Sequence, residues 1–345
     1  MKNKKRILSI FLAIASVCAL AVGCKKEEAN KSDITVYMPD GAPALAFSKL
    51  MHEDNDEDGA SYFVVNASDI AKKVSYKNTD ENADFCVLPL TVATAKVGSG
   101  EQYQMVGAVT HGNLYMISKD TESSYTAENL SSLIGQKVGV LQLASTPGMI
   151  FKSALAKNGL PYNDLSAENA IHVSDKINLK PIVIPEGTAP AQALNAMIQQ
   201  GVNLFVMAEP AVTALKKGGF QTVGDVQTIY GEQGYTQAVL VAKKSVLAGK
   251  TDWVKEFLEK VEESATWATT ASGETLVTAV QSHFEDQSAT TSLNASVLNG
   301  EVVARSGVRF EWSSVCKART EAFLQIAKTV EEKTVLPSEN FYWLG

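Results

Sequence analysis

Arginine is scarce in this chain of 345 residues, where it occurs only at Arg6, Arg305, Arg309 and Arg319. Proteins that recognise a carboxylate commonly use the planar guanidinium, which can donate two parallel hydrogen bonds. None of the loops that we predict below to hold a ligand carries an arginine. Unless Arg305 or Arg309 reaches back to these loops, an anion would have to be held by backbone amides, helix N-termini and hydroxyls.

Cysteine is also rare, with four residues at positions 18, 24, 86 and 316. Cys86 lies in an apolar segment that is typical of a buried strand, where cysteine behaves as a small hydrophobe. A bridge between Cys86 and Cys316 stays open, but their setting does not indicate a disulfide framework. The sequence has no CxxC motif and no metal-ligand spacing, so we expect neither a metal nor a cofactor.

Familiar catalytic motifs are missing as well. The sequence contains no GxSxG, no HExxH and no GxxxxGK followed by Ser or Thr. Catalysis would need a nucleophile with a base, or two carboxylates within reach of each other. Asp40 and Glu209 are only a speculative pair, so the motifs favour a binding protein over an enzyme.

The first residues have the parts of a bacterial secretory signal. A basic start, MKNKKR, precedes an apolar run at 7–22, and the sequence AVGC at 21–24 resembles a lipobox. We predict that residues 1–23 are a signal peptide, that Cys24 carries an acyl lipid such as palmitate, and that 24–32 form a lipidated tether. The alternative is a plain signal anchor, for which the apolar run is short.

The chain is acidic, with a net charge of −7. Loss of the signal would remove Lys2, Lys4, Lys5 and Arg6, which takes the net charge to −11. An acidic chain is a poor candidate for nucleic-acid binding. Because no apolar run after residue 24 is long enough to span a membrane, we expect an extracytoplasmic monomer that is soluble except for its lipid anchor.

Residues 34–51 predict a strand, a turn and a helix in succession. Residues 34–38 are β-branched and aromatic, as in a buried strand, and 39–42 have turn chemistry. Pro43 suits the start of a helix, and apolar residues follow at helical spacing. The amides of a first helical turn have no partners inside the helix, so such a unit can present them to a ligand.

The same order of strand, loop and helix recurs along the chain. Further strands are predicted at 62–65, 84–88, 137–141, 181–184 and 204–207. Alternation at this spacing predicts an α/β fold with mostly parallel sheets. Ligands of such sheets bind outside the carboxyl ends of the strands, so we expect these loops to surround one crevice.

Two crossings of the chain divide it into two predicted lobes. The first lobe would hold 33–116 and 237–345, and the second would hold 117–236, with the first crossing near 115–120. We expect residues after 243 to be helical, including a helix at 315–329 that packs on the first lobe. The two lobes would be joined by a two-crossing hinge.

Several short motifs occur in an order that is similar to a known family. They are the lipobox, Gly41-Ala42-Pro43 after a strand, Asp84 to Pro89, Ser145 to Gly148, Met207-Ala208-Glu209-Pro210 before Gly218-Gly219, and Leu336-Pro337 through Phe341-Tyr342. Together they resemble solute-binding lipoproteins of ABC importers, most closely the nitrate, sulfonate and thiamine-precursor binders. The resemblance implies a type II periplasmic-binding-protein fold, a ligand between two hinged lobes, and delivery to permease and ATPase subunits.

The candidate ligand-binding residues lie on the predicted crevice loops or near the crossings. They are Asp40, Gly41, Ala42, Asn66, Ser68, Leu90, Thr91, His111, Ser145, Thr146, Gly148, Thr188, Glu209 and Tyr235. Thr146 could instead cap a helix, Gly41 and Gly148 could serve backbone geometry, and Asp40 could cap its own turn. Glu209 would bind a ligand amine, or else contact the hinge or the permease.

These features predict capture of a small polar, heteroaromatic or anionic solute. Asp40 and Glu209 could accept hydrogen bonds from ring nitrogens or an amine, or an anion could bind to amides and hydroxyls instead. The main alternative is an enzyme on the same two-lobed fold, such as the menaquinone-pathway enzymes that resemble these binders. A sensory lobe is a third possibility.

Overall fold

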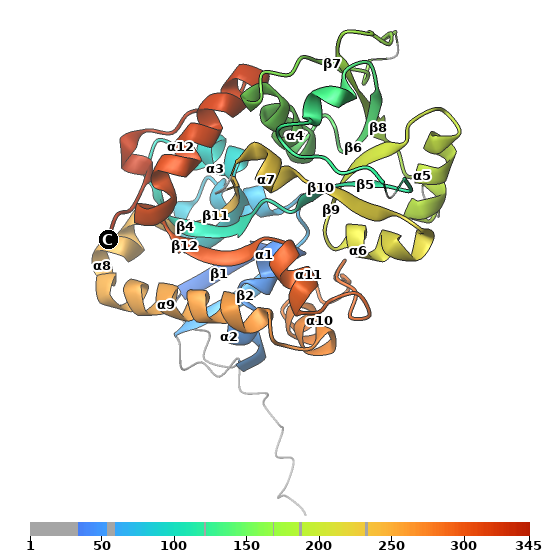
Figure 1. The fold of residues 1–345 in the computed structure, drawn as a ribbon. Helices are drawn as coiled ribbons and strands as arrows, with labels where there is room; N and C mark the ends of the chain where they lie inside the picture. Colours follow the sequence, from blue (N-terminus) through green and yellow to red (C-terminus); the bar gives the residue numbers. More distant parts are fainter. Residues whose placement is uncertain (1–33, 54–58, 121, 168, 186–187, 232–233) are drawn as a thin grey trace, which may run out of the picture.

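The computed structural model describes residues 34–53, 59–120, 122–167, 169–185, 188–231 and 234–345. The predicted signal peptide, Cys24 and the tether lie outside these residues. Two lobes, each built on a sheet of six strands, lie side by side in Figure 1. This arrangement confirms the predicted two-lobed α/β fold.

The first sheet has the strand order β12-β4-β11-β3-β1-β2. Its strands are β12 (Val308–Trp312), β4 (Tyr103–His111), β11 (Thr236–Lys243), β3 (Phe85–Pro89), β1 (Ile34–Pro39) and β2 (Ala60–Val65). Only the pairs of β1 with β2 and with β3 are parallel. The other three pairs are antiparallel.

The second sheet has the order β10-β5-β9-β6-β8-β7. Its strands are β10 (Gln221–Asp225), β5 (Leu114–Ser118), β9 (Leu204–Ala208), β6 (Lys137–Leu141), β8 (Ile177–Ile182) and β7 (Tyr162–Asp164). Parallel pairing links β9, β6, β8 and β7, whereas β5 pairs antiparallel with both neighbours. The sheets are therefore mixed, and the prediction of mostly parallel sheets was wrong in this detail.

The first crossing falls earlier than predicted. Strand β4 of the first sheet ends at His111, and β5 of the second sheet begins at Leu114. Residues 114–116, which we had placed in the first lobe, thus belong to the second sheet. The chain returns to the first sheet between α7 (Val226–Tyr230) and β11.

Helices cover both faces of the first sheet. Apolar residues of α2 (Ser48–Glu53), α8 (Lys244–Gly249), α9 (Thr251–Ala268), α10 (Gly273–Ser282) and α11 (Gly300–Arg305) pack with one face, next to the short α1 (Ala42–Leu45). The opposite face packs against α3 (Leu90–Val97) and α12 (Ser313–Val330). The helix predicted after Pro43 is thus two short helices, α1 and α2.

The second sheet lies between two smaller helical layers. Helices α4 (Thr146–Lys157) and α7 pack on one face, and α5 (Pro190–Ile198) and α6 (Ala211–Leu215) pack on the other. Short 3₁₀ helices at Ile70–Val74, Thr79–Glu81, Leu130–Leu133, Lys216–Gly218 and Glu339–Phe341 complete the described fold.

Helix α12 joins the two lobes. It packs on β4 and β11 of the first sheet and also on α4 of the second lobe, which it approaches in Figure 1. The rings of Phe323 and Tyr230 lie 5.7 Å apart, and Thr320 Oγ1 lies 2.8 Å from Thr236 Oγ1 in a buried hydrogen bond. The helix that we predicted to pack on the first lobe thus also contacts the second lobe.

Two further predictions concern cysteines and membrane spans. Cys86 and Cys316 are both buried, free thiols, and burial raises the pKa of each, that of Cys316 to about 11. Among the described residues, no helix combines the length and the apolar character that a membrane crossing requires.

Candidate functional site

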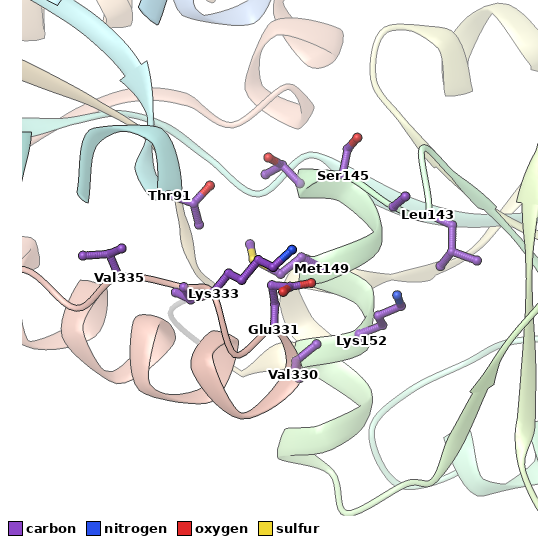
Figure 2. Close-up of a pocket in the computed structure, with 12 residues that line it drawn as sticks. Thr91, Leu143, Ser145, Met149, Lys152, Val330, Glu331, Lys333 and Val335 are labelled. Carbon is purple, nitrogen blue, oxygen red and sulfur yellow. The ribbon is translucent and has the colours of Figure 1, made fainter. Parts of the chain in front are cut away.

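A cavity of about 460 Å³ opens between the lobes, where β3 and β6 end. We call it the cleft cavity, and Figure 2 shows its lining. The first lobe contributes Thr91 and the segment that follows α12, and the second lobe contributes the loop before α4 and the first turns of α4. The lining residues are Thr91, Leu143, Ala144, Ser145, Thr146, Met149, Lys152, Val330, Glu331, Lys333, Thr334 and Val335.

The wall of the cavity on the second lobe is formed by the first turn of α4 and by the loop before it, which packs closely against that turn. Pro147 stands in the first turn of α4, where its missing N–H costs no helical hydrogen bond. A Cβ atom on Gly148 would lie 2.0 Å from the carbonyl oxygen of Leu143, so only glycine allows the loop to fold against the helix. The Ser145 side chain makes no capping hydrogen bond, which leaves its hydroxyl available to a ligand.

Basic and hydroxyl groups dominate the polar lining of this cavity. Lys152 and Lys333 carry positive charge, Thr91, Ser145, Thr146 and Thr334 carry hydroxyls, and Glu331 carries the single carboxylate among the lining residues. The Lys152 ammonium is already paired with Asp164 at 2.5 Å. Burial alone would raise the pKa of Asp164, but its hydrogen bonds with Lys152 and Ser166 lower it below its usual value.

Glu209 is engaged by protein groups. Its side chain is fully buried, and it accepts hydrogen bonds from Arg305 Nε at 2.7 Å and from the amide and hydroxyl of Thr213, both at 3.0 Å. Arg305 ends α11 in the first lobe, whereas Glu209 follows β9 in the second. The Glu209 carboxylate is therefore paired across the lobes, and its binding of a ligand amine stays a prediction.

Arg305 makes further contacts with the second lobe. One terminal nitrogen of its guanidinium donates to Thr222 Oγ1 at 3.2 Å, and the group lies 4.1 Å from the ring centre of Tyr115. The Tyr115 hydroxyl donates to the Arg305 carbonyl at 3.0 Å, and burial raises its pKa to about 12. We call Arg305, Glu209, Thr222 and Tyr115 the interlobe clasp.

Asp40 also binds protein groups. Its two carboxylate oxygens accept hydrogen bonds from Thr291 Oγ1 at 2.6 Å and from the Ser292 amide at 2.7 Å. Gly41 follows with φ +104°, a conformation that favours glycine, and Ala42 begins α1. Asp40 thus binds a loop of its own lobe that is distant in sequence. We had considered that it could cap its own turn, and the structural role seen here is related to that one.

His111 and Tyr235 are buried at the crossings and line no described cavity. Burial lowers the pKa of His111 to about 3, with help from the nearby Arg309 and Arg319 charges, while Glu311 acts in the opposite sense. A Cβ atom on Gly112 would lie 2.2 Å from the Tyr235 ring, so the two crossings are in tight contact. These residues are part of the hinge packing.

The remaining candidates are separated from one another. Leu90 is buried in the core, Asn66 and Ser68 are exposed after β2, and Thr188 is half-buried before α5. Of the fourteen predicted residues, the cleft cavity brings together Thr91, Ser145 and Thr146, with Gly148 directly behind them. Whether they bind a ligand stays a prediction.

Of the first-lobe wall, only Thr91 was predicted from the sequence. Residues 330–335 reach the cavity because α12 packs across both lobes, and this depends on tertiary contacts. Lys152 could have been found from α4, since it lies one helical turn after Gly148. Among the described residues, no cluster of His, Cys, Asp and Glu could hold a metal ion.

No protein-family model matches the sequence, and no curated protein matches it either. Solved structures do match. An ABC transporter from Parabacteroides distasonis is 19% identical, covers 91% of this chain and 99% of its own, and has a TM-score of 0.64.

Two sulfonate-binding proteins have a similar fold. The periplasmic aliphatic sulphonate binding protein SsuA from Escherichia coli is 16% identical, with 90% of this chain and 91% of that chain covered and a TM-score of 0.57. The alkanesulfonate-binding protein SsuA from Xanthomonas axonopodis pv. citri, bound to MOPS, is 14% identical over 90% and 97%, with a TM-score of 0.52. The chain therefore has the two-lobed α/β fold of periplasmic binding proteins.

Proposed function

We propose that this chain is an extracytoplasmic solute-binding lipoprotein that captures a small anion in the cleft cavity. The observation that carries the proposal is a cavity between two lobes, where strands end and the N-terminus of α4 begins. Parallel strands and helix N-termini direct unpaired backbone amides toward such a place, and these amides favour negative charge.

The charged groups of the crevice support an anion over a cation. Asp40 and Glu209, the two carboxylates that could have recognised an amine or a ring nitrogen, are bound to Thr291, Ser292, Thr213 and Arg305. The cavity instead offers hydroxyls and lysines. A neutral heteroaromatic solute would leave the Lys333 ammonium without an anionic partner.

Delivery to a membrane importer is the second part of the proposal. Similar folds occur in an ABC transporter and in two sulfonate-binding proteins, which supports an equivalent role with permease and ATPase subunits. The lipobox-like sequence ending at Cys24 supports a lipid anchor on the outer face of the membrane. Cys24→Ser should release the chain from membranes, and unchanged membrane fractionation would remove the anchor from the proposal.

Binding explains the cavity better than catalysis does. Ser145 would need a base to act as a nucleophile, and Lys152 is held by Asp164 at 2.5 Å. Among the lining residues, no histidine is present to serve as that base. We therefore propose that the chain is not an enzyme.

The test is calorimetry with matched solutes. We expect alkylsulfonates or nitrate to bind with one site per chain, and thiamine precursors or neutral heteroaromatic metabolites to bind more weakly or not at all. If no anion in the panel binds, the ligand class is wrong. If only the neutral or cationic solutes bind, the crevice has the opposite preference.

A further inference from the structure

The wall of the cleft cavity that follows α12 has a fixed shape. We call residues 331–335 the C-terminal segment. The Glu331 amide donates to Ala327 O at 2.8 Å, and the Thr334 amide donates to Glu331 O at 2.9 Å. The buried Thr334 also donates through Oγ1 to Ala327 O at 3.4 Å, so the segment is tied to the last turn of α12.

A second anchor holds the chain just beyond this segment. The Ser338 amide donates to Gly98 O at 2.8 Å, and its hydroxyl donates to Ser99 O at 2.6 Å. Gly98 ends α3, the helix whose first turn carries Thr91. The C-terminal segment therefore stands in a defined place beside the first-lobe side of the cavity.

Lys333 is the group that this segment presents to the cavity. Figure 2 shows its side chain extending from the segment toward α4 of the second lobe. Lys152, the other lysine in the lining, is paired with Asp164. Lys333 takes part in no ion pair with any residue that the structure describes, so its charge is available to a ligand.

We propose that Lys333 selects the charge of the solute, and that the C-terminal segment is part of the binding site. This inference rests on the proposed function, and it adds that the solute is a monoanion. The Lys333 ammonium would donate to an anionic oxygen that also meets Ser145 and Thr146 from the second lobe. Glu331 in the same wall disfavours a second negative charge.

The experiment uses the full-length chain and propanesulfonate as the probe. Calorimetry would compare Lys333→Gln, Lys333→Arg and Glu331→Gln with Lys328→Gln, which removes the same charge from an exposed site on α12 outside the cavity. We expect Lys333→Gln to weaken binding about 5- to 20-fold, because a charge-assisted hydrogen bond in a partly exposed cavity is lost.

The other variants should behave differently. Lys333→Arg should keep the dissociation constant within about 3-fold, Lys328→Gln within about 2-fold, and Glu331→Gln should tighten binding about 2- to 3-fold. Equal dissociation constants for Lys333→Gln and Lys328→Gln would overturn this inference while leaving the proposed function intact. If the unmodified chain binds neither propanesulfonate nor any other anion of the panel, the proposed function fails first and the inference falls with it.

Discussion

Two regions along the junction of the lobes differ in how they use charge. In the interlobe clasp, Arg305 and Glu209 meet at 2.7 Å across the lobes, and Glu209 is wholly buried. In the cleft cavity, Lys333 faces open space and finds no acidic partner in the part of the chain that the structure describes. In the clasp, the charges of Arg305 and Glu209 pair with each other across the lobes. In the cavity, the charge of Lys333 is available to a solute.

The physical reason for this difference lies in burial. A buried carboxylate is stable only when it is paired and hydrogen-bonded, so Glu209 needs Arg305 and Thr213. A lysine at the wall of an open cavity stays hydrated, so its ammonium needs no acidic partner from the protein before a ligand binds. Changes in the clasp should therefore alter stability, and changes in the cavity should alter binding.

The largest effect is expected for Arg305→Met. The change keeps the aliphatic stem but leaves Glu209 buried without its cation, and we expect the free energy of unfolding to fall by about 2–4 kcal/mol. Urea unfolding would measure it. Arg309→Met is the matched control, because Arg309 pairs with Glu311 near the surface and should cost less than about 1 kcal/mol.

A double variant sharpens this first test. Adding Glu209→Gln to Arg305→Met removes the unpaired charge, so the combined loss should be clearly smaller than the sum of the two single losses. If Arg305→Met and Arg309→Met shift the urea midpoint equally, the clasp does not hold the lobes.

The hinge between these regions should show a pH dependence. Burial lowers the pKa of His111 to about 3 from its usual 6.5, so the unfolded chain binds a proton first as pH falls. Stability from this group is complete above pH 6.5 and is lost as pH falls toward 3. Between pH 6.5 and 4.5 the loss should be about 2–3 kcal/mol.

Urea unfolding at several pH values would compare the unmodified chain with His111→Phe. We expect the variant to lose less stability than the unmodified chain over the same interval, since it has no imidazole to protonate. Arg309, Arg319 and Glu311 face His111 and are present in both proteins, so the comparison isolates the imidazole. Parallel stability curves for the two proteins would contradict a buried neutral His111.

Gly148→Ala tests the geometry of the cavity wall. Its Cβ atom would lie 2.0 Å from Leu143 O, so the loop must move away from α4. We expect a loss of about 1–3 kcal/mol in unfolding free energy together with weaker anion binding. Gly249→Ala is the control, because no atom lies within 4 Å of the new Cβ atom there. Equal behaviour of the two variants would show that the loop is not held against the helix.

Thr91→Val should have the smallest effect. It removes one hydroxyl from the cavity without changing the size of the side chain, so the free energy of unfolding should change by less than about 0.5 kcal/mol. Loss of one hydrogen bond to the anion would raise the dissociation constant about 3- to 10-fold. A variant with unchanged affinity would place the solute away from Thr91.

The edge strand β2 was predictable from the sequence, but the other three edge strands were not. Strand β6 matches its predicted range, because its run of β-branched and apolar residues is bounded by turn residues on either side. Strands β7, β10 and β12 were missed, and each lies at the edge of a sheet with few buried positions. Strand β8 begins earlier than predicted, and Val183, which we had included, is 67% exposed.

The site was predictable only where local sequence sets it. Ser145, Thr146 and Gly148 follow a strand and open a helix, so the order of residues was enough to find them. The roles of Asp40 and Glu209 depend on Thr291 and Arg305, which lie far along the chain and meet them only after folding. Lys333 could not be found for the same reason.

The most direct test of the central claim is calorimetry of Ser145→Trp with an alkylsulfonate or nitrate that binds the unmodified chain. The exposed Ser145 lines the cleft cavity, so an indole there should occupy the space of the solute, whereas Ser131→Trp adds the same group at an exposed site outside it. The account predicts one site per chain in the unmodified protein and in Ser131→Trp, and loss of binding in Ser145→Trp. Equal binding by both variants would contradict a solute site between the lobes at this cavity.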